Sequence, residues 1–538
     1  MDSGQLLFTD FLYLDVLILY GYFMRVFIAI LFVMAGFICQ AQDIVPYPNK
    51  YEKTEGLLKV PGEVSVSASD GFAELIPVFI ESARQFDVQV KGKKKKGFIR
   101  LVRNGKLTEA EEYRLHVGRK AVIVEAGTAA GCFYGLQSAL HLIKNAGEGG
   151  RIDCAEISDR PRYAWRGVML DESRYFLGKD EVKTLLDLMA FQKLNKFHWH
   201  LTDVPGWRIE IKQYPLLATV GGKGNQSDPN APVRYYTQAE IKEIVDYAGK
   251  RFIEVIPEID MPGHAASAVK AYPEFSGGGS ERYPDFTFNP GKEGTYGFLT
   301  NILKEVAGLF PSRYIHIGGD EVHFGNKQWN VLPEVKKLMQ EQGLTSLVEV
   351  ERYFLNRMAD SVQVMGKTVI GWDEVVAAGL SGSNTVAMWW RHDKPDLLKE
   401  ALRKGYEVIL SPRIPFYFDF VQHKTHTQGR LWPGGLFVPI EAVYQFTDTT
   451  FTAGNPEWAR QIKGVQANMW TDRIHSREGM QYMLYPRLSA LAETAWTNES
   501  RKDQDDFLSR MERMMEVYKK KGLYFFDYRN PSGTSEVK

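Results

Sequence analysis

Short apolar segments and amphipathic segments alternate along the chain, and the kind of alternation changes near residue 158. Before it, the stretch 113–127 (YRLHVGRKAVIVEAG) alternates apolar and polar positions as half-buried strands do, whereas 132–146 (CFYGLQSALHLIKNA) has helical spacing. This mixture predicts a small α+β domain over residues 42–157. The Pro- and Arg-rich segment 158–167 is interpreted as a linker.

Beyond the linker, short apolar strands alternate with helices up to about residue 500, and helices are expected over segments such as 180–194, 237–250 and 333–365. This order implies parallel strands joined by right-handed crossovers, so we predict a closed (β/α)8 TIM barrel over 158–500. Residues 501–538 are predicted to form a helical tail that packs on the barrel, and the run SGGGS at 276–280 a flexible loop. The eight strand candidates are 167–174 (GVMLDESR), 196–203 (KFHWHLTD), 252–260 (FIEVIPEID), 314–321 (YIHIGGDE), 368–374 (TVIGWDE), 384–390 (NTVAMWW), 406–412 (YEVILSP) and 462–470 (IKGVQANMW).

The N-terminal region is interpreted separately from the fold. Residues 24–42 (MRVFIAILFVMAGFICQAQ) show one basic residue, an apolar run and then small or polar residues, the pattern of a secretory signal. We expect a signal region within 1–41 that is cleaved after Ala41, with Met24 as the true start; lipid attachment at Cys39 is the alternative. The protein is therefore expected to be exported, as a periplasmic, secreted or lipid-anchored protein, with no membrane span in the mature chain.

Composition narrows the functional classes. Lys+Arg and Asp+Glu are equal at 66 each, so the chain lacks the basic excess that is typical of nucleic-acid binders. The one dense basic cluster, KGKKKKG at 91–97, is interpreted as a solvated loop or hairpin tip. No nucleic-acid partner is expected.

Polar and aromatic residues recur at or just after the C-terminal ends of the predicted strands. In a (β/α)8 barrel these ends converge on one mouth, where active sites are built. One such residue has an ordinary alternative, such as an ion pair of Arg174 with Asp171 or Glu172, but the whole set favours a site. The set consists of Arg174, Asp203, His264, Asp320, Glu321, Trp372, Trp390, Tyr417, Trp470 and Asp472.

Two of these residues, Asp320 and Glu321, are adjacent carboxylates that follow a buried strand. Neighbouring strand residues point to opposite faces, so both side chains reach the mouth only if the chain turns there, and Gly318 and Gly319 permit that turn. Close carboxylates repel, so one is expected to hold its proton near neutral pH. A proton-bearing acid beside a charged partner suits glycoside cleavage.

With these residues in view, the chain resembles the family 20 glycoside hydrolases, the β-N-acetylhexosaminidases. The resemblance runs from about residue 43 to about residue 500 and rests on HIGGDE, HWHLTDVPGWRIEI, PEIDMPGH, GWDE and GVQANMWTD, in that family's order. It implies an exo-acting retaining enzyme that needs no cofactor or metal and acts on oligosaccharides or glycoconjugates with a terminal β-linked GlcNAc or GalNAc. It also implies substrate-assisted catalysis, in which the sugar's acetamido oxygen attacks C1 and forms an oxazolinium intermediate.

The resemblance assigns a role to each matching residue. Glu321 corresponds to the general acid/base, and Asp320 to the residue that orients the acetamido N–H and stabilises the developing positive charge. Arg174 would hold the C3 and C4 hydroxyls. Asp203 and His264 would form a polar network near the acid/base. The remaining matches are Tyr417, which would hydrogen-bond the acetamido oxygen, and Trp372, Trp390 and Trp470, which would wall the sugar site; Trp389 is the neighbouring alternative to Trp390.

One position departs from the family pattern. Two residues after Trp470 the family usually has Glu, which binds the C4 and C6 hydroxyls, whereas this chain has the shorter Asp472. The preference between GlcNAc and GalNAc and the tolerance of substituents at C6 depend on how this contact is made.

Three other interpretations remain open. His198, His200, His264, His316 and Asp320 have the residue types of a metal-dependent barrel hydrolase of the amidohydrolase type. A lacto-N-biosidase-like enzyme of the same family would release a disaccharide. A non-catalytic glycan-binding barrel is disfavoured because both carboxylates are present.

Overall fold

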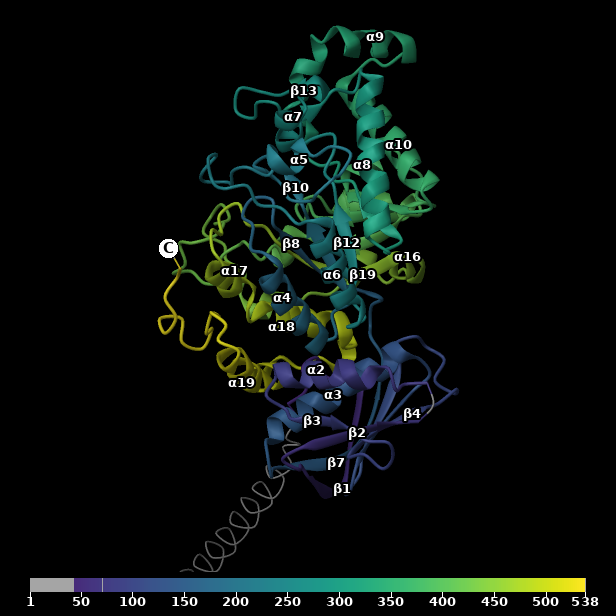
Figure 1. The fold of residues 1–538 in the computed structure, drawn as a ribbon, viewed down its shortest axis with the longest axis vertical. Coiled ribbons are helices and arrows are strands. Elements are labelled where there is room, and N and C mark those ends of the chain that lie inside the picture. The colour runs from purple at the N-terminus through teal and green to yellow at the C-terminus, as the bar shows by residue number, and fades with distance from the viewer. Residues whose placement is uncertain (1–42, 70, 538) are drawn as a thin grey trace, which may run out of the picture. The chain divides into compact units, whose positions relative to one another are not determined.

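The computed structural model describes residues 43–69 and 71–537, whose arrangement is drawn in Figure 1. The predicted signal region at 1–41 lies outside the described residues. Within the described part of the chain, every helix is too short or too polar to cross a membrane.

The first part of the described chain is an α+β domain built on a seven-stranded sheet of order β1-β7-β5-β6-β4-β2-β3. Strands β1, β7, β5 and β6 pair antiparallel, and β6, β4, β2 and β3 pair parallel. Figure 1 shows α2 and α3 between this sheet and the barrel. The elements are β1 (Lys50–Lys59), β2 (Val64–Ala68), α2 (Leu75–Gln85), β3 (Val90–Gly92), β4 (Ile99–Arg103), β5 (Tyr113–Val117), β6 (Val122–Ala126), α3 (Ala129–Ala146) and β7 (Arg151–Asp159).

The second part is the predicted TIM barrel. Its eight strands are all parallel and close in the order β12-β15-β16-β17-β18-β19-β8-β9. Seven strands lie within their predicted segments, β8 begins two residues before its segment, and nearly all strand residues are buried. The strands are β8 (Trp165–Asp171), β9 (Lys196–His200), β12 (Glu254–Glu258), β15 (Tyr314–His316), β16 (Thr368–Trp372), β17 (Thr385–Trp389), β18 (Glu407–Leu410) and β19 (Ile462–Met469).

Helices surround the barrel, and two short hairpins lie in the loops that follow β9 and β12. The longer helices are α4 (Lys179–Phe191), α6 (Gln238–Gly249), α8 (Glu293–Leu309), α9 (Pro333–Gln342), α10 (Leu347–Val364), α12 (Pro395–Arg403), α17 (Arg477–Leu484), α18 (Arg487–Trp496) and α19 (Gln504–Lys520). The shorter helices are α5 (Leu216–Thr219), α7 (Ala266–Ala271), α11 (Glu374–Ala377), α13 (Arg413–Phe416), α14 (Ile440–Tyr444), α15 (Thr449–Thr452) and α16 (Pro456–Gln461). The two hairpins pair β10 (Thr202–Asp203) with β11 (Gly206–Trp207) and β13 (Ser276–Gly278) with β14 (Thr287–Phe288).

Two predicted segments differ in the structure. The single helix expected over 333–365 is two helices, because Gly343 adopts a left-handed conformation (φ 65°) that ends α9 and Ser346 begins α10 with a capping box to Glu349. The linker expected over 158–167 is shorter, since β7 runs to Asp159 and β8 begins at Trp165.

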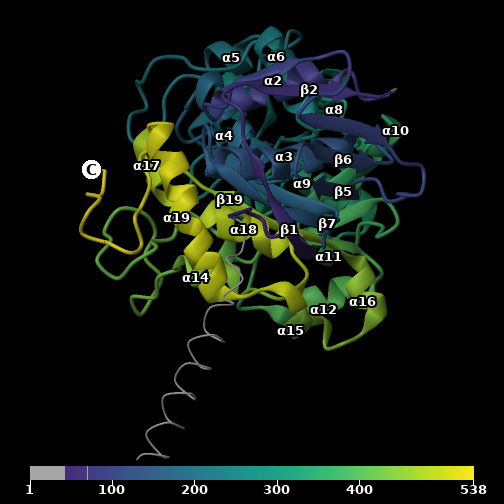
Figure 2. The same ribbon diagram turned by 90° about the horizontal axis from the view of Figure 1, so that it is seen from below.

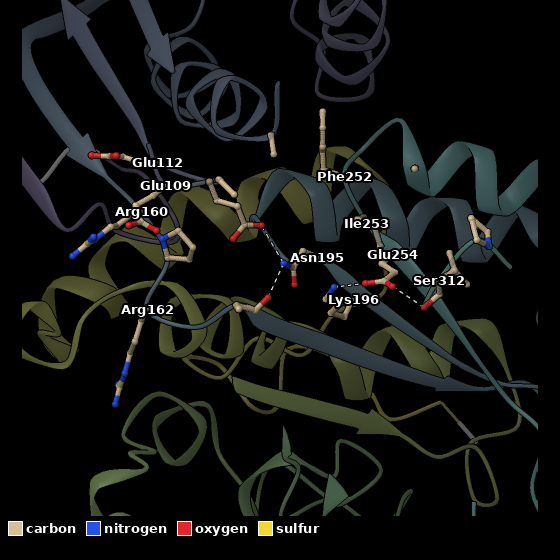
Figure 3. A pocket seen from close by; sticks show the side chains of 18 of the residues that line it. Glu109, Glu112, Arg160, Arg162, Asn195, Lys196, Phe252, Ile253, Glu254 and Ser312 are labelled. Atoms are coloured by element: carbon tan, nitrogen blue, oxygen red, sulfur yellow. Dashed lines mark hydrogen bonds and ion pairs between the residues drawn. The ribbon is translucent and has the colours of Figure 1, made fainter. Parts of the chain in front are cut away.

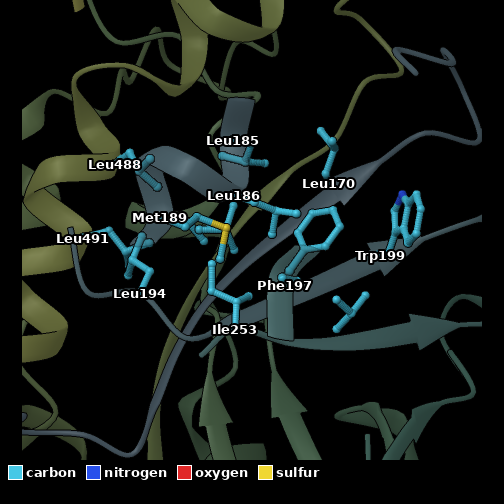
Figure 4. Close-up of a cluster of buried hydrophobic side chains, with 14 of the residues drawn as sticks. Leu170, Leu185, Leu186, Met189, Leu194, Phe197, Trp199, Ile253, Leu488 and Leu491 are labelled. Carbon is cyan, nitrogen blue, oxygen red and sulfur yellow. The ribbon is translucent and has the colours of Figure 1, made fainter. Parts of the chain in front are cut away.

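The packing between α4 and the barrel shows how the helical layer is held. Leu185, Leu186 and Met189 of α4 face Phe197 and the neighbouring barrel strands, and α18 closes the cluster from the other side (Figure 4). Burying one such side chain contributes about 1.5–3 kcal/mol. The barrel wall is therefore stabilised by its helices.

The α+β domain and the C-terminal helix pack against the barrel helices, as the second view also shows (Figure 2). His141 of α3 contacts the main-chain oxygen of Phe191 at the end of α4, with 3.1 Å between Nε2 and O. In α19, Arg510 binds Glu493 of α18 through Nη2 and Oε1 at 2.6 Å. Both contacts are buried, so these parts form one body with the barrel.

A cleft of about 840 Å3 lies where the α+β domain meets the N-terminal ends of β9, β12 and β15 (Figure 3). Several of its polar groups are paired with one another: Asn195 binds Glu111 (3.2 Å), and Glu254 binds both Lys196 and Ser312. In TIM barrels this end stabilises the fold, whereas chemistry takes place at the opposite end. The cleft is thus a joint between domains on the side away from the predicted mouth.

Candidate active site

The adjacent carboxylates sit on a sharp turn after β15. Gly318 and Gly319 have φ of 69° and 93°, and Glu321 itself is left-handed at φ 54°. A Cβ on Gly318 would lie 1.8 Å from Oδ1 of Asp260, so only glycine fits there. The turn leaves Asp320 9% exposed, whereas the side chain of Glu321 is 32% exposed. The sequence predicted this turn from the two glycines.

His264 joins the two carboxylates. Its Nε2 lies 3.5 Å from Oδ2 of Asp320 and 3.6 Å from Oε2 of Glu321, and its Nδ1 lies 2.9 Å from Oδ1 of Asp203. Asp203 in turn accepts from Nε2 of His200 at 2.9 Å. The predicted polar network of Asp203 and His264 is therefore assembled beside both carboxylates.

Arg174 belongs to the same network. One guanidinium nitrogen lies 2.7 Å from Oδ2 of Asp203 and another 3.3 Å from Oδ2 of Asp171, and the guanidinium lies over the Trp470 ring at 5.1 Å. The ion pair with Asp171, the ordinary alternative, is thus present together with the contact to the site.

The two carboxyls differ in their pKa values. Burial, opposed by the His264 charge and reinforced by Glu321, raises the pKa of Asp320 to about 6. Burial also acts to raise the pKa of Glu321, but the hydrogen bond and charge of His264 outweigh it and lower that pKa below its usual range. His264 is a cation here, because Asp203, Asp260 and Asp320 overcome its burial and hold its pKa well above the usual value. Of the pair, Asp320 is therefore the carboxyl that binds a proton first as the pH falls.

Four aromatic side chains from different strand ends form a cluster next to Asp320. Trp470 lies 5.9 Å from Trp372 and 6.1 Å from Tyr417, measured between ring centroids, and Trp390 is parallel to Tyr417 at 6.4 Å. Burial and then the charge of Asp320 raise the pKa of the Tyr417 hydroxyl, so this group interacts electrostatically with the carboxylate.

Of the two neighbouring tryptophans at the end of β17, only one takes part in this cluster. Trp389 points away from the mouth: its ring packs on Phe451 at 4.9 Å, and its indole N–H donates to the main-chain oxygen of Lys394. Trp390 donates to Oε2 of Glu374 at 3.1 Å.

Sequence reasoning missed Glu258, which lies at the centre of the barrel beneath the site. Its carboxylate binds His198 (3.0 Å) and His200 (2.5 Å) of β9, and His316 (2.9 Å) of β15; it also accepts the indole N–H of Trp372 (3.0 Å). Burial opposes ionisation, but the three histidines hold the pKa of Glu258 well below its usual range. This carboxylate fixes both Trp372 and the histidine that supports Asp203.

Asp472 forms an ion pair with Arg430 at the rim of the site. Arg430 donates to Oδ2 of Asp472 at 2.7 Å and to Oδ2 of Asp419 at 3.0 Å. Asp419 is fully buried, and desolvation raises the pKa of its carboxyl to about 7 although Arg430 opposes this. Asp419, two residues after Tyr417, was also missed by sequence reasoning, although this spacing was a signal for it.

The histidines on which the metal-dependent interpretation rests lie close to other possible ligands in the structure. Three groups offer ligand atoms within 4.8 Å of one another: His198, Glu258 and His316; His200, Asp203 and Asp260; and Asp260, His264 and Asp320. In each group the histidines already contact carboxylates of the same network, such as Glu258 and Asp203. Hydrogen bonding therefore accounts for this convergence.

A parallel eight-stranded barrel whose strand ends carry this carboxylate pair and aromatic cluster defines a TIM-barrel glycoside hydrolase. Residues 163–499 match the family model "Glycosyl hydrolase family 20, catalytic domain", and residues 41–160 match "Glycosyl hydrolase family 20, domain 2". The chain belongs to glycosyl hydrolase family 20, and by this membership it is a glycoside hydrolase of the β-N-acetylhexosaminidase type.

Individual relatives agree with this assignment. A beta-hexosaminidase of Porphyromonas gingivalis is 33% identical over 493 residues, covering 87% of this chain and 62% of that protein. One from Vibrio furnissii is 32% identical, covering 84% and 76%. Among solved structures, the GH20 exo beta-N-acetylglucosaminidase of Vibrio harveyi in complex with N-acetylglucosamine has a TM-score of 0.83 at 31% identity, covering 90% of this chain and 78% of that one. The beta-N-acetylhexosaminidase of Bacteroides fragilis has a TM-score of 0.80 at 32% identity, with coverages of 92% and 99%.

Proposed function

We propose that the protein is an exo-acting retaining β-N-acetylhexosaminidase that removes terminal β-linked GlcNAc or GalNAc by substrate-assisted catalysis. The observation that carries this proposal is Oδ1 of Asp320. This oxygen is buried beside the aromatic cluster and has no hydrogen-bond partner among the described residues. A buried carboxylate oxygen without a partner is costly, and the N–H of a 2-acetamido group is a fitting donor for it.

In this mechanism the sugar ring lies among Trp372, Trp390 and Trp470, with its acetamide between Asp320 and Tyr417. Asp320 accepts the acetamido N–H, and the Tyr417 hydroxyl donates to the acetamido oxygen. That oxygen is thereby held against C1, where it forms the new bond as the glycosidic bond breaks. Such prearrangement of a reacting group supplies a large part of a rate enhancement.

Glu321 protonates the departing oxygen and then deprotonates the water that attacks C1 of the oxazolinium ion, which gives net retention. In the free protein its pKa is low because the contact with the cationic His264 outweighs the effect of its burial. A bound sugar displaces that water, and desolvation raises the pKa of a carboxyl. Binding therefore favours moving the shared proton from Asp320 to Glu321, where the leaving group needs it.

Arg174 and Asp472 are assigned to the hydroxyls at the non-reducing end. Because Asp472 is also tied to Arg430, its contact with the sugar depends on one short side chain and is weakly selective. We expect both GlcNAc and GalNAc glycosides to be hydrolysed. A hydrolysis panel that compares these glycosides with 6-sulfated GlcNAc and lacto-N-biose glycosides tests this expectation. Its lacto-N-biose glycoside also tests the alternative that the enzyme releases a disaccharide.

The direct test replaces the two carboxylates separately. Glu321→Gln is expected to lower kcat on a methyl N-acetyl-β-glucosaminide by about 10²–10⁴-fold while the sugar still binds, because general acid catalysis is lost. Asp320→Asn is expected to cause heavy loss on 2-acetamido substrates only. Full activity of Glu321→Gln, equal wild-type rates on glucosides without the acetamide, or a trapped ester to the protein would refute the mechanism.

We also propose that the protein is exported. The support is the signal-like sequence 24–42 and its small residues before Gln42. Mass determination of the mature N-terminus after cell fractionation tests this: a start at Gln42 is expected, and an intact Met1 or Met24 in the cytoplasm contradicts export.

A further inference from the structure

The glycine-rich segment 276–280, predicted as a flexible loop, is a packed hairpin beside the catalytic turn. A Cβ would lie 2.3 Å from the Phe288 oxygen at Gly277, 1.7 Å from Oε1 of Gln328 at Gly278, and 2.0 Å from the Tyr283 oxygen at Gly279. The glycines therefore serve close packing of the β13–β14 hairpin.

The tip of this hairpin is held by its own hydrogen bonds. The Ser280 N–H donates to the Tyr283 oxygen at 2.9 Å, and the Ser276 hydroxyl donates to Oδ1 of Asp285 at 2.9 Å. The Gly279 N–H donates to Oε1 of Gln328 at 3.3 Å, which ties the tip to the segment that follows the catalytic turn. Tyr283 is thus presented in a defined position.

A series of aromatic contacts connects Tyr283 with the surroundings of Glu321, the proposed acid/base. Its ring is stacked on Phe324, with centroids 5.5 Å apart and planes 15° apart, and lies 5.5 Å from Phe286. Phe286 in turn lies 4.7 Å from the His264 ring. Phe324 is three residues after Glu321, and its N–H donates to the Glu321 main-chain oxygen at 2.9 Å.

Phe286 is buried, but Tyr283 and Phe324 are both partly exposed, and the proposed chemistry does not use them. A general acid lies within hydrogen-bond reach of the oxygen it protonates, so the departing group lies on the Glu321 side of the bond. Phe324 lies in the turn that directly follows Glu321, and Tyr283 of the hairpin tip stacks on it, so both rings lie close in the structure to the proposed acid/base. Aromatic rings pack well against apolar C–H faces.

We propose that Tyr283 and Phe324 form a platform that binds the sugar unit from which the terminal HexNAc is removed. This platform rests on the proposed function and narrows its substrate class to chains in which the β-HexNAc is attached to another pyranose ring. The bound ring contacts the platform through its C–H face, so the platform selects by shape and apolar contact.

The test compares two glycosides with alkyl-alcohol leaving groups: GlcNAc-β-1,4-GlcNAc, and methyl N-acetyl-β-glucosaminide, which has no second ring. Tyr283→Ala is expected to lower kcat/KM on the disaccharide by about tenfold and to change it on the methyl glycoside by less than about twofold. Tyr283→Phe, which keeps the ring, is expected to restore the disaccharide rate. Tyr524→Ala, a half-buried tyrosine of the C-terminal segment, is the matched control.

The outcomes separate the two proposals. If the wild type hydrolyses both glycosides and Tyr283→Ala lowers both rates equally or neither, the platform is refuted and the proposed function stands. If the variant unfolds, Phe324→Ala takes its place with the same criterion. If the wild type hydrolyses neither glycoside, the proposed function fails and the platform fails with it.

Discussion

His264 lowers the pKa values of both carboxyls to which the proposed mechanism assigns catalysis, so in that mechanism its charge shifts the pH range of activity. The productive form carries one proton on the pair Asp320–Glu321. Activity therefore falls at low pH when both carboxyls are protonated and at high pH when both are ionised. His264 lowers the pKa of each carboxyl. In His264→Gln, where the amide still reaches Asp203 but carries no charge, both pKa values rise and the profile moves to higher pH.

The size of this shift follows from the distances. His264 Nε2 lies 3.5 Å from Asp320 and 3.6 Å from Glu321. At these separations one unit charge contributes roughly 1 kcal/mol in water and about 5 kcal/mol at an effective dielectric constant of 20. Since one pKa unit corresponds to about 1.4 kcal/mol, we expect both limbs to move up by about 1–3 units, with the smaller shift at the more exposed Glu321.

The assay measures kcat/KM of wild type and His264→Gln on a methyl N-acetyl-β-glucosaminide from pH 3 to 9. The wild-type descending limb is expected near pH 6, the pKa of Asp320. His116→Gln, which removes another contact between histidine and carboxylate in the α+β domain, is the control and should reproduce the wild-type profile. A variant profile that superimposes on the wild type, or moves to lower pH, would refute the assigned role of the His264 charge.

Two further predictions concern the network beneath the site. Glu258→Ala removes the acceptor shared by three histidines and Trp372, so it should lower the free energy of unfolding, measured by urea titration above pH about 4.5, by about 3–5 kcal/mol, and the difference should shrink at lower pH. The control Glu407→Ala, at an exposed position of β18, should change the free energy of unfolding by less than about 0.5 kcal/mol. A similar loss of stability in both variants would contradict the importance of the network. Excess EDTA should leave kcat/KM unchanged because hydrogen bonding accounts for the clustered histidines, whereas activity lost with chelator and restored by zinc would favour the metal-dependent alternative.

The barrel was predictable because its strands are short, apolar and separated by helices, so that order alone fixed a parallel closed sheet. The errors came from local backbone features within that frame. The helix expected over 333–365 is interrupted between α9 and α10, where a left-handed Gly343 and the Ser346–Glu349 capping box override a continuous amphipathic pattern. The glycines at 277–279 looked like a flexible loop because their packing partners, Phe288 and Gln328, are distant in sequence.

The site was predictable wherever a residue stood at a strand end, since those ends meet at the mouth. Glu258 is the last residue of β12, but its position alone did not single it out, because its importance depends on side chains from β9, β15 and β16 that only the closed barrel brings together. Similarly, the resemblance marked Asp472 as a substrate ligand, but the sequence did not indicate its contact with Arg430, which also binds Asp419.

Adjacency of Asp320 and Glu321 predicts that their pKa values differ, but it does not predict which one is higher. That order depends on the turn at Gly318 and Gly319, which buries Asp320 more deeply than Glu321, and on His264, whose charge outweighs burial at Glu321 but not at Asp320. In the unliganded protein the higher pKa consequently belongs to Asp320, the residue that the proposed mechanism uses in its ionised form. A substrate that covers Glu321 and donates its acetamido N–H to Asp320 reverses both influences at once. In the proposed mechanism, the binding of a 2-acetamido sugar thus favours the protonated form of Glu321, and proton placement contributes to specificity for that sugar.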